Sequence, residues 1–266
     1  MRDNTAAILA HPGFSLFTHK SEKWAKLAFP SIRACHEFAK KHARKPDVTG
    51  WFHSESWCGL ETQSFADFDQ TGIATYIRDL VSSTESKMPH RLTRLAEPRA
   101  AITGGYWDTP AVLAGIPLAA RQRVRAKLPP KSVRLAFFMS AGLNSTEMSK
   151  LTAKITRAIW EYTLAGGAVD LKVAYIGLSR ATSTGAKGIA IETAVNVSDI
   201  AAVALSLSPA MYRTICGPLQ TAFSEYDQDP ISPPQYCPLP GYLWIGGTLE
   251  AAIKAANETI KALQII

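Results

Sequence analysis

One short segment of the chain carries a cation at every second position: Arg121, Arg123, Arg125 and Lys127. If the segment is extended, these side chains point to one face, because the side chains of a strand alternate between its two faces. Their spacing of roughly 6–7 Å then matches the phosphate repeat of a nucleic-acid strand. If the segment is helical, or is a solvated linker that ends at Pro129-Pro130, the match disappears. The extended alternative predicts a phosphate-binding ribbon.

A second group of cations lies in a segment whose pattern is typical of a helix, residues 31–45. Apolar residues recur there at helical spacing, and Pro30 and Pro46 flank the segment. The candidate nucleic-acid contacts near its end are Lys40, Lys41 and Arg44. The alternative is that these cations only complement the negative end of the helix dipole.

Aromatic residues accompany the cations in this half of the chain, which holds four of the six tryptophans. Exposed rings beside cations are typical of single-strand binding, because bases stack on the rings while the cations follow the phosphates. Trp51 and Trp57 are the candidate stacking rings. The alternative for each ring is a place in a hydrophobic core.

The charge of the chain is unevenly distributed. The 266 residues hold 29 Lys and Arg against 22 Asp and Glu, a net charge of +7. Residues 1–134 hold 20 against 12, a net charge of +8, and residues 135–266 hold 9 against 10. The whole basic excess therefore lies in the first half, as expected if that half faces a polyanion. The apolar fraction of 47% argues against disorder.

Motifs for catalysis, nucleotides and metals are absent from the sequence. It contains no phosphate-loop motif, HExxH, paired CxxC or GxSxG. Residues 183–188 resemble a phosphate loop only superficially, since the glycine spacing is wrong and no helix is expected after them. His53, Glu55 and Cys58 lack the companion ligands of a zinc site. We therefore expect a protein that is not an enzyme and that binds no cofactor or metal.

The second half of the chain predicts an α/β fold. Strands are expected over residues 132–140, 169–177, 187–197 and 242–245, and helices over 145–165, 199–207, 209–225 and 249–264. This alternation is typical of a three-layer, Rossmann-like sheet. We place a domain boundary after Pro130, which gives a basic N-terminal region of residues 1–130 and an α/β domain of residues 131–266.

The first half predicts a mixed α+β region rich in aromatic residues. Residues 1–30 are expected to be irregular with one short strand or helix, and residues 70–84 to be helical. Gly104-Gly105 permits a sharp turn, and Pro110 suits the first turn of a helix. Residues 104–115 therefore predict a compact strand–turn–helix unit.

The sequence has no feature of a membrane or secreted protein. No apolar stretch approaches the 18 residues of a membrane-spanning helix, and no signal peptide is expected. Four scattered cysteines do not form a disulfide framework. We expect reduced thiols, a cytoplasmic location and no membrane partner.

The second half resembles a von Willebrand factor A-type domain. The likeness is carried by the strand at 133–139, the stretch Ser140-Ala141-Gly142-Leu143-Asn144-Ser145, the long helix, Gly166-Gly167 and the following strand. This family has an Asp-x-Ser-x-Ser metal motif after its first strand, where this chain has Ser140, Gly142 and Asn144. The resemblance implies an α/β interaction fold with a degenerate metal site that lacks its carboxylate.

A further likeness is to an uncharacterised group of bacteriophage proteins. It is carried by residues 104–117, GGYWDTPAVLAGIP, and residues 208–213, SPAMYR. The resemblance implies a viral origin and action in the cytoplasm of an infected host cell.

These observations lead to two expected functions. The first is a non-enzymatic accessory protein that binds nucleic acid, single-stranded DNA above all, through its basic N-terminal half. This role resembles that of podophage proteins that recruit a phage RNA polymerase, and a replication factor is the other partner expected. The alternative is a metal-independent protein–protein interaction module in a virion or a phage–host assembly.

Overall fold

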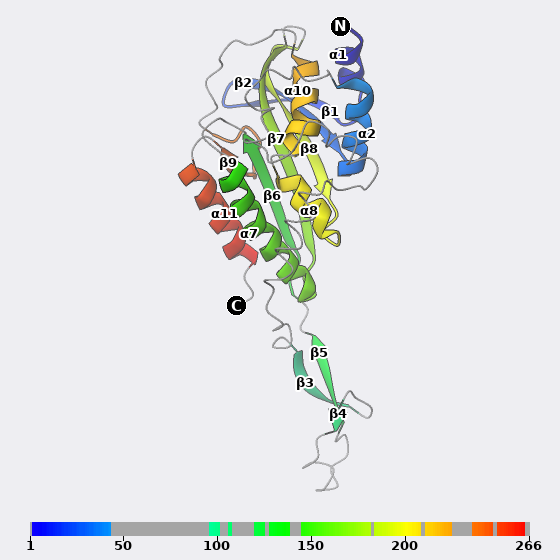
Figure 1. Ribbon diagram of the computed structural model, residues 1–266, viewed down its shortest axis with the longest axis vertical. Helices are drawn as coiled ribbons and strands as arrows, with labels where there is room; N and C mark the ends of the chain where they lie inside the picture. The colour runs from blue at the N-terminus through cyan, green and yellow to red at the C-terminus, as the bar shows by residue number, and fades with distance from the viewer. Residues whose placement is uncertain are drawn as a thin grey trace.

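The computed structural model of the chain shows strands and helices arranged around one mixed sheet (Figure 1). The structure describes residues 2–43, 96–101, 106–107, 120–125, 128–138, 145–181, 184–208, 211–224, 236–246 and 249–263. The helix predicted over residues 70–84 lies outside these ranges, and so does most of the strand–turn–helix unit predicted over 104–115.

Residues 2–29 form a helix and a hairpin: α1 (Arg2–Leu9), β1 (Phe14–His19) and β2 (Glu22–Phe29). The hairpin turns at Lys20 and Ser21, whose φ angles of 48° and 64° suit a two-residue turn that matches the strand twist. The prediction that residues 1–30 are irregular with one short element is wrong. The turn has no glycine or asparagine to mark it, and the strands gain their order from pairing that the sequence does not show.

The helix predicted over residues 31–45 is confirmed as α2 (Ile32–His42). The Ser31 hydroxyl caps it by accepting a hydrogen bond from the Ala34 amide at 3.1 Å. Its buried residues, Ile32, Cys35, His36 and Ala39, follow the helical spacing that the sequence shows.

Three further strands form a sheet of their own: β3 (Ala96–Ala101), β4 (Tyr106–Trp107) and β5 (Ala120–Arg125). β5 is the middle strand and pairs antiparallel with both neighbours. The register sets Ala96 opposite Arg125 and Tyr106 opposite Arg121. The basic segment is therefore extended over Ala120–Arg125, which is the alternative that the phosphate-binding hypothesis requires.

The second half alternates strands and helices in the predicted order, so the α/β class is confirmed: β6 (Lys131–Phe138), α7 (Ser145–Leu164), β7 (Val169–Ala181), β8 (Ala186–Val195), α8 (Ile200–Leu207), the π-helix η3 (Tyr212–Cys216), α10 (Gly217–Phe223), β9 (Leu243–Gly246) and α11 (Leu249–Leu263). In place of the single helix predicted over residues 209–225, the structure has the π-helix η3 followed directly by the α-helix α10. The Gly217 amide donates to the Tyr212 carbonyl oxygen five residues back, which makes a π turn just before Pro218, a residue without an amide hydrogen.

The described strands of the main sheet run in the order β1-β2-β8-β7-β6-β9. β1–β2 and β7–β8 are antiparallel pairs, and the other three pairs are parallel. The N-terminal hairpin is therefore part of the same sheet as the second half. The predicted boundary after residue 130 therefore divides one sheet, because β1 and β2 lie before it and the other strands of the sheet lie after it. A boundary placed where the local pattern changes could not reveal that β2 pairs with β8, because that pairing joins distant parts of the chain.

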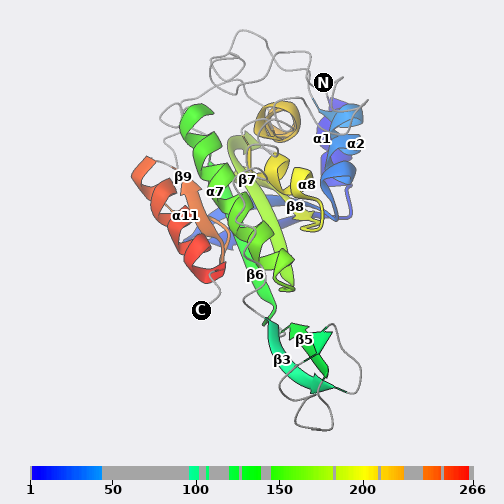
Figure 2. The ribbon, with the colours of Figure 1, turned by 60° about the horizontal axis from the view of Figure 1, so that its bottom comes forward.

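The helices pack on one face of this sheet (Figures 1 and 2). Leu27 of β2, Leu135 of β6, Val173 of β7 and Ile191 of β8 form the centre of that face and are fully buried. They share one core with the buried sides of the described helices α1, α2, α7, α8, α10 and α11. Burial of each such side chain contributes about 1.5–3 kcal/mol, so this core fixes the helices on the sheet.

The opposite face, which we call the helix-free face, holds a smaller cluster without helical residues in the described part of the chain: Trp24, Ala136, Ala174, Ile176, Ala190 and Leu239. Residues 236–246 supply its cover, with Tyr242 and Trp244 packed against it. Gly188 makes room for Trp24, since a Cβ at Gly188 would lie 2.7 Å from the ring atom Cζ3. No helix of the described ranges covers this face, so it is available for other contacts.

Candidate functional site

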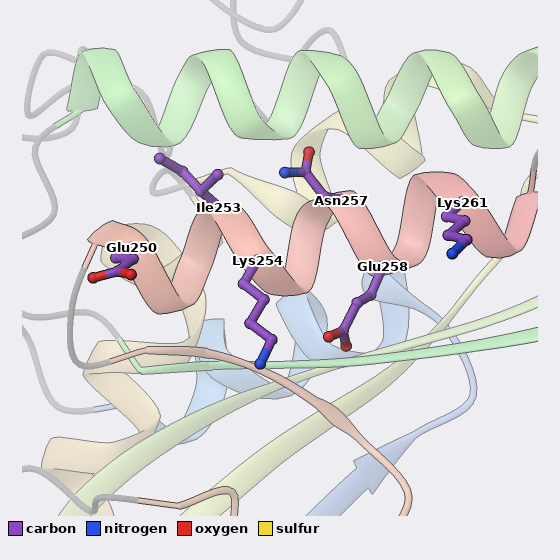
Figure 3. Close-up of a pocket in the computed structure, with 6 residues that line it drawn as sticks. All are labelled: Glu250, Ile253, Lys254, Asn257, Glu258 and Lys261. Carbon is purple, nitrogen blue, oxygen red and sulfur yellow. The ribbon is translucent and has the colours of Figure 1, made fainter.

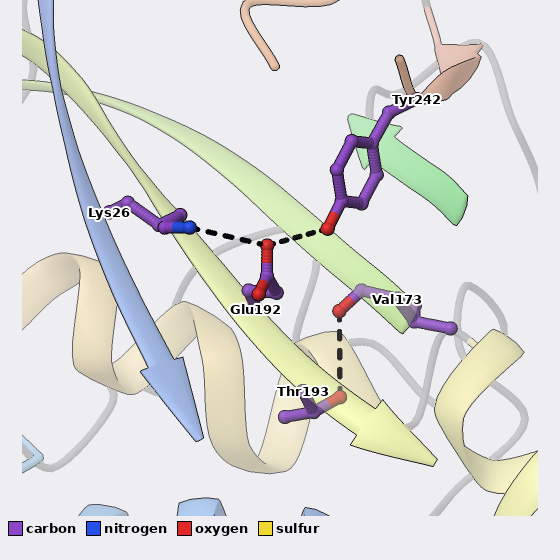
Figure 4. A network of polar contacts seen from close by, with 5 residues as sticks. All are labelled: Lys26, Val173, Glu192, Thr193 and Tyr242. Atoms are coloured by element: carbon purple, nitrogen blue, oxygen red, sulfur yellow. Dashed lines mark hydrogen bonds and ion pairs between the residues drawn. The ribbon is translucent and has the colours of Figure 1, made fainter. Parts of the chain in front are cut away.

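Glu192 on β8 is a carboxylate near the centre of the helix-free face, and only 7% of the residue is exposed. The Tyr242 hydroxyl donates to Glu192 Oε2 at 2.5 Å, and Lys26 Nζ lies 3.7 Å from the same oxygen (Figure 4). Lys26 comes from β2, the neighbour of β8, so sheet pairing brings the two charges together. Thr193, the next residue of β8, donates to the Val173 carbonyl oxygen at 3.5 Å. Lys26, Glu192 and Tyr242 form the Glu192 cluster.

A second cluster of the same composition surrounds Glu22 on β2. Lys187 Nζ donates to Glu22 Oε1 at 2.5 Å, and the Tyr236 hydroxyl donates to Glu22 Oε2 at 2.6 Å. Lys20 Nζ lies 3.9 Å from the centre of the Tyr236 ring, which adds a cation–π contact. Glu22, Lys187 and Tyr236 form the Glu22 cluster.

The two clusters are reciprocal. Each of the paired strands β2 and β8 gives one glutamate and one lysine, and each glutamate meets the lysine of the other strand. Both tyrosines come from residues 236–242, just before β9. The clusters therefore fasten this segment to the sheet at two points, and we call the arrangement the tyrosine clasp.

The pKa shifts in the clasp follow from its hydrogen bonds. The bonds from Lys187 and Tyr236 hold the pKa of Glu22 below its ordinary value. The bond to Glu22 raises the pKa of Tyr236, and burial followed by the bond to Glu192 raises that of Tyr242. Both hydroxyls therefore stay protonated donors near neutral pH, which suits fastening of a segment rather than proton transfer.

Cations and rings lie beside the Glu192 cluster on the helix-free face. Arg134 of β6 is the cross-strand partner of Lys172 of β7, and Ala136 is the partner of Trp244. Arg134 is exposed, whereas Lys172, Tyr242 and Trp244 are half-buried. The positive charge of Arg134 acts on the Tyr242 hydroxyl and counters part of the rise in its pKa.

The cations predicted to form the phosphate-binding ribbon are placed in part. Arg121, Arg123 and Arg125 occupy alternate positions of β5, the middle strand of the small sheet. Lys127 lies outside the described residues. The structure thus brings three of the four residues onto one strand.

The other predicted contacts are less completely described. Lys40 and Lys41 are exposed in the last turn of α2, which packs on the helix-covered face of the sheet. Arg44, Trp51 and Trp57 lie outside the described residues. Lys40 and Lys41 are therefore on the side of the sheet opposite the Glu192 cluster.

Among the side chains of the described ranges, no group of three His, Cys, Asp or Glu residues could hold a metal ion. Two stretches lie outside these ranges: residues 140–144, which correspond to the metal motif of the von Willebrand A family, and His53, Glu55 and Cys58.

A shallow surface hollow lies along α11 (Figure 3). Its lining comes from one helix: Glu250, Ile253, Lys254, Asn257, Glu258 and Lys261. The charges alternate in sign at the spacing typical of a solvated helix face. This hollow therefore offers no converging set of groups from different elements.

Sequence reasoning did not propose Arg134, Lys172, Glu192, Tyr242 or Trp244 as site residues. One signal in the sequence could have indicated that Arg134 faces solvent. In β6, polar Ser132 and Arg134, which are exposed, alternate with apolar Val133 and Leu135, which are buried. The partners of these residues depend on strand order and register, which the sequence alone does not give.

In comparisons with known proteins, no family model, no curated protein and no solved structure matches the chain. Among the described residues, no helix combines the length and apolar character needed to cross a membrane.

Proposed function

We propose that the chain is a non-enzymatic bacteriophage accessory protein that binds single-stranded nucleic acid, with DNA as the favoured ligand. The observation that carries this proposal is the extended conformation of β5 over Ala120–Arg125. It meets the condition under which the cations at positions 121, 123 and 125 follow a phosphate backbone.

The distribution of charge supports the same proposal. Residues 1–134 carry a net charge of +8, whereas residues 135–266 carry −1. Lys40 and Lys41 are exposed cations within that basic half, and Trp51 and Trp57 are the proposed stacking rings. A long-range attraction of this kind speeds the encounter with a polyanion.

The finer parts of the proposal concern context. We propose a von Willebrand A-like arrangement for residues 131–266, which the parallel β6–α7–β7 unit supports, with the described helices on one face of the sheet instead of the three layers expected from the sequence. Recruitment of a phage RNA polymerase or a replication factor, in the cytoplasm of the infected host cell, completes the proposed role.

The test is binding of a fluorescent single-stranded oligonucleotide at salt concentrations from about 50 to about 300 mM. The triple variant Arg121→Ala, Arg123→Ala, Arg125→Ala should make the negative slope of log affinity against log salt shallower by about 2, because each phosphate contact on a single strand contributes roughly 0.7 to its magnitude. The charge-matched control replaces three exposed lysines of α7 and α11: Lys154, Lys254 and Lys261. A flat salt dependence of the unaltered protein, or equal slopes for the two triple variants, would overturn the proposal.

The alternative function is a metal-independent protein–protein interaction module. Its test uses Ile253 of α11, which is one of two large apolar side chains exposed among the described residues, with 41% of its surface exposed. A partner protein that is recovered equally before and after nuclease treatment, and that is lost with Ile253→Lys, would support this function.

A further inference from the structure

Two cations lie side by side on the helix-free face. Arg134 of β6 and Lys172 of β7 are cross-strand partners in a parallel pair, and cross-strand partners project to the same face of a sheet. Arg134 is exposed and Lys172 is half-buried. They lie on the opposite side of the sheet from the helical core.

These cations have no carboxylate partner within the part of the chain that the structure describes. Glu192, the carboxylate at the centre of this face, is engaged by Lys26 and Tyr242 instead. Like charges directly opposite each other in a sheet are destabilising. An anion bound between Arg134 and Lys172 would remove that repulsion.

Two aromatic rings lie beside the cations. Trp244 of β9 is the cross-strand partner of Ala136, two residues after Arg134 on the same strand. Tyr242 is two residues before Trp244, and both rings are half-buried. The hydrogen bond to Glu192 fixes the Tyr242 ring over the sheet (Figure 4). The Tyr242 ring is thus held in place before any ligand arrives, which lowers the entropic cost of binding. The Trp244 ring packs against the same apolar cluster of the helix-free face.

We infer that this part of the helix-free face is a second contact surface for single-stranded nucleic acid, with Arg134 and Lys172 on the phosphates and Tyr242 and Trp244 on the bases. The inference rests on the proposed function and gives it a surface independent of β5. Cations beside fixed rings favour a single strand, because a duplex keeps its bases stacked on each other. Asp170, two residues before Lys172 on the same strand, is an exposed carboxylate beside these cations.

The first experiment compares the double variant Arg134→Ala, Lys172→Ala with a control that removes two exposed lysines from the helices, Lys154→Ala, Lys254→Ala. On a single-stranded oligonucleotide the first variant should make the negative slope of log affinity against log salt shallower by about 1.4, as two lost phosphate contacts require. The conservative variant Arg134→Lys, Lys172→Arg should keep the slope. A slope equal to that of the control variant would overturn the inference.

The second experiment maps contacts directly. An oligonucleotide with 5-bromodeoxyuridine should crosslink on irradiation to the peptide that contains Tyr242 and Trp244, and an unlabelled duplex should compete poorly. Crosslinks confined to other peptides, or equal competition by the duplex, would contradict the inference.

The two proposals fail in different ways. If the β5 variant loses binding while the Arg134 and Lys172 variant retains it, the second surface is wrong and the proposed function stands. If the unaltered protein shows no salt-dependent binding and instead retains an acidic protein, both proposals are wrong.

Discussion

The Tyr242 hydroxyl donates to Glu192 Oε2 at 2.5 Å and so joins the segment before β9 to the centre of the sheet. Only 10% of the Glu192 side chain is exposed, and Lys26 approaches the same oxygen at 3.7 Å. A carboxylate with so little solvent needs hydrogen bonds as well as a counter-charge. The Tyr242 hydroxyl therefore takes the place of water as a hydrogen-bond donor to the Glu192 carboxylate.

Replacing Tyr242 by phenylalanine removes the hydroxyl and keeps the ring. We expect the free energy of unfolding at pH 7 to fall by about 1–3 kcal/mol, because a hydrogen bond to a charged, mostly buried group is lost. Urea denaturation measures this change. Tyr236→Phe is the matched comparison and should cost less, because 31% of the Glu22 side chain is exposed. Unchanged stability of Tyr242→Phe would show that the bond contributes nothing.

Glu22 makes stability depend on pH. Its pKa in the folded protein is below the ordinary value because Lys187 and Tyr236 donate to it. The stabilisation is therefore complete above the ordinary pKa, near 4.3, and is lost as the pH falls through the lowered pKa. Glu22→Gln should flatten the loss of stability between about pH 5 and pH 3, measured by urea unfolding at each pH. Glu258→Gln on α11 is the control, and an equal effect of both variants would contradict the prediction.

The sequence allowed the elements of the second half to be predicted because they are local. The helix α7 (Ser145–Leu164) follows from apolar spacing and from the glycines that end it, Gly166 and Gly167. β6 follows from an apolar run after two prolines. Each of these signals needs only the residues of the element itself.

The site depends on relationships that are not local. Glu192 meets Lys26 because β8 lies beside β2, and Arg134 meets Lys172 because of the register between β6 and β7. No pattern within one strand determines its neighbour. The charge asymmetry of the chain suggested where to look for cations, but Lys172 lies in the half that is close to neutral.

Gly188 is predicted to be intolerant of a larger residue. A Cβ at this position would lie 2.3 Å from the Gly177 carbonyl oxygen and 2.7 Å from the Trp24 ring. Backbone cannot move away as a flexible side chain can, so Gly188→Ala should lower stability by about 1–3 kcal/mol. Thermal unfolding measures the loss. Ser132→Ala, at an exposed position of β6, is the control, and equal melting temperatures for the two variants would contradict the close contact.

Cys237 reports on the tyrosine clasp. It lies between Tyr236 and Tyr242, its thiol donates to the Leu239 carbonyl oxygen at 3.3 Å, and burial raises its pKa to about 11. At pH 8 its thiolate fraction is then about two orders of magnitude below that of an ordinary thiol. We expect slow alkylation of Cys237 by iodoacetamide in the native protein, followed by peptide mass spectrometry, and rapid alkylation in urea.

The double variant Tyr236→Phe, Tyr242→Phe should accelerate alkylation of Cys237, because it removes both hydrogen bonds that hold the segment on the sheet. The rate at Cys216, which is buried in the helical core, should stay unchanged and controls for global unfolding. Faster labelling of both cysteines would mean that the whole fold has loosened. Equal rates at Cys237 in the double variant and the unaltered protein would mean that the tyrosines do not hold the segment, since a released segment exposes its thiol to solvent.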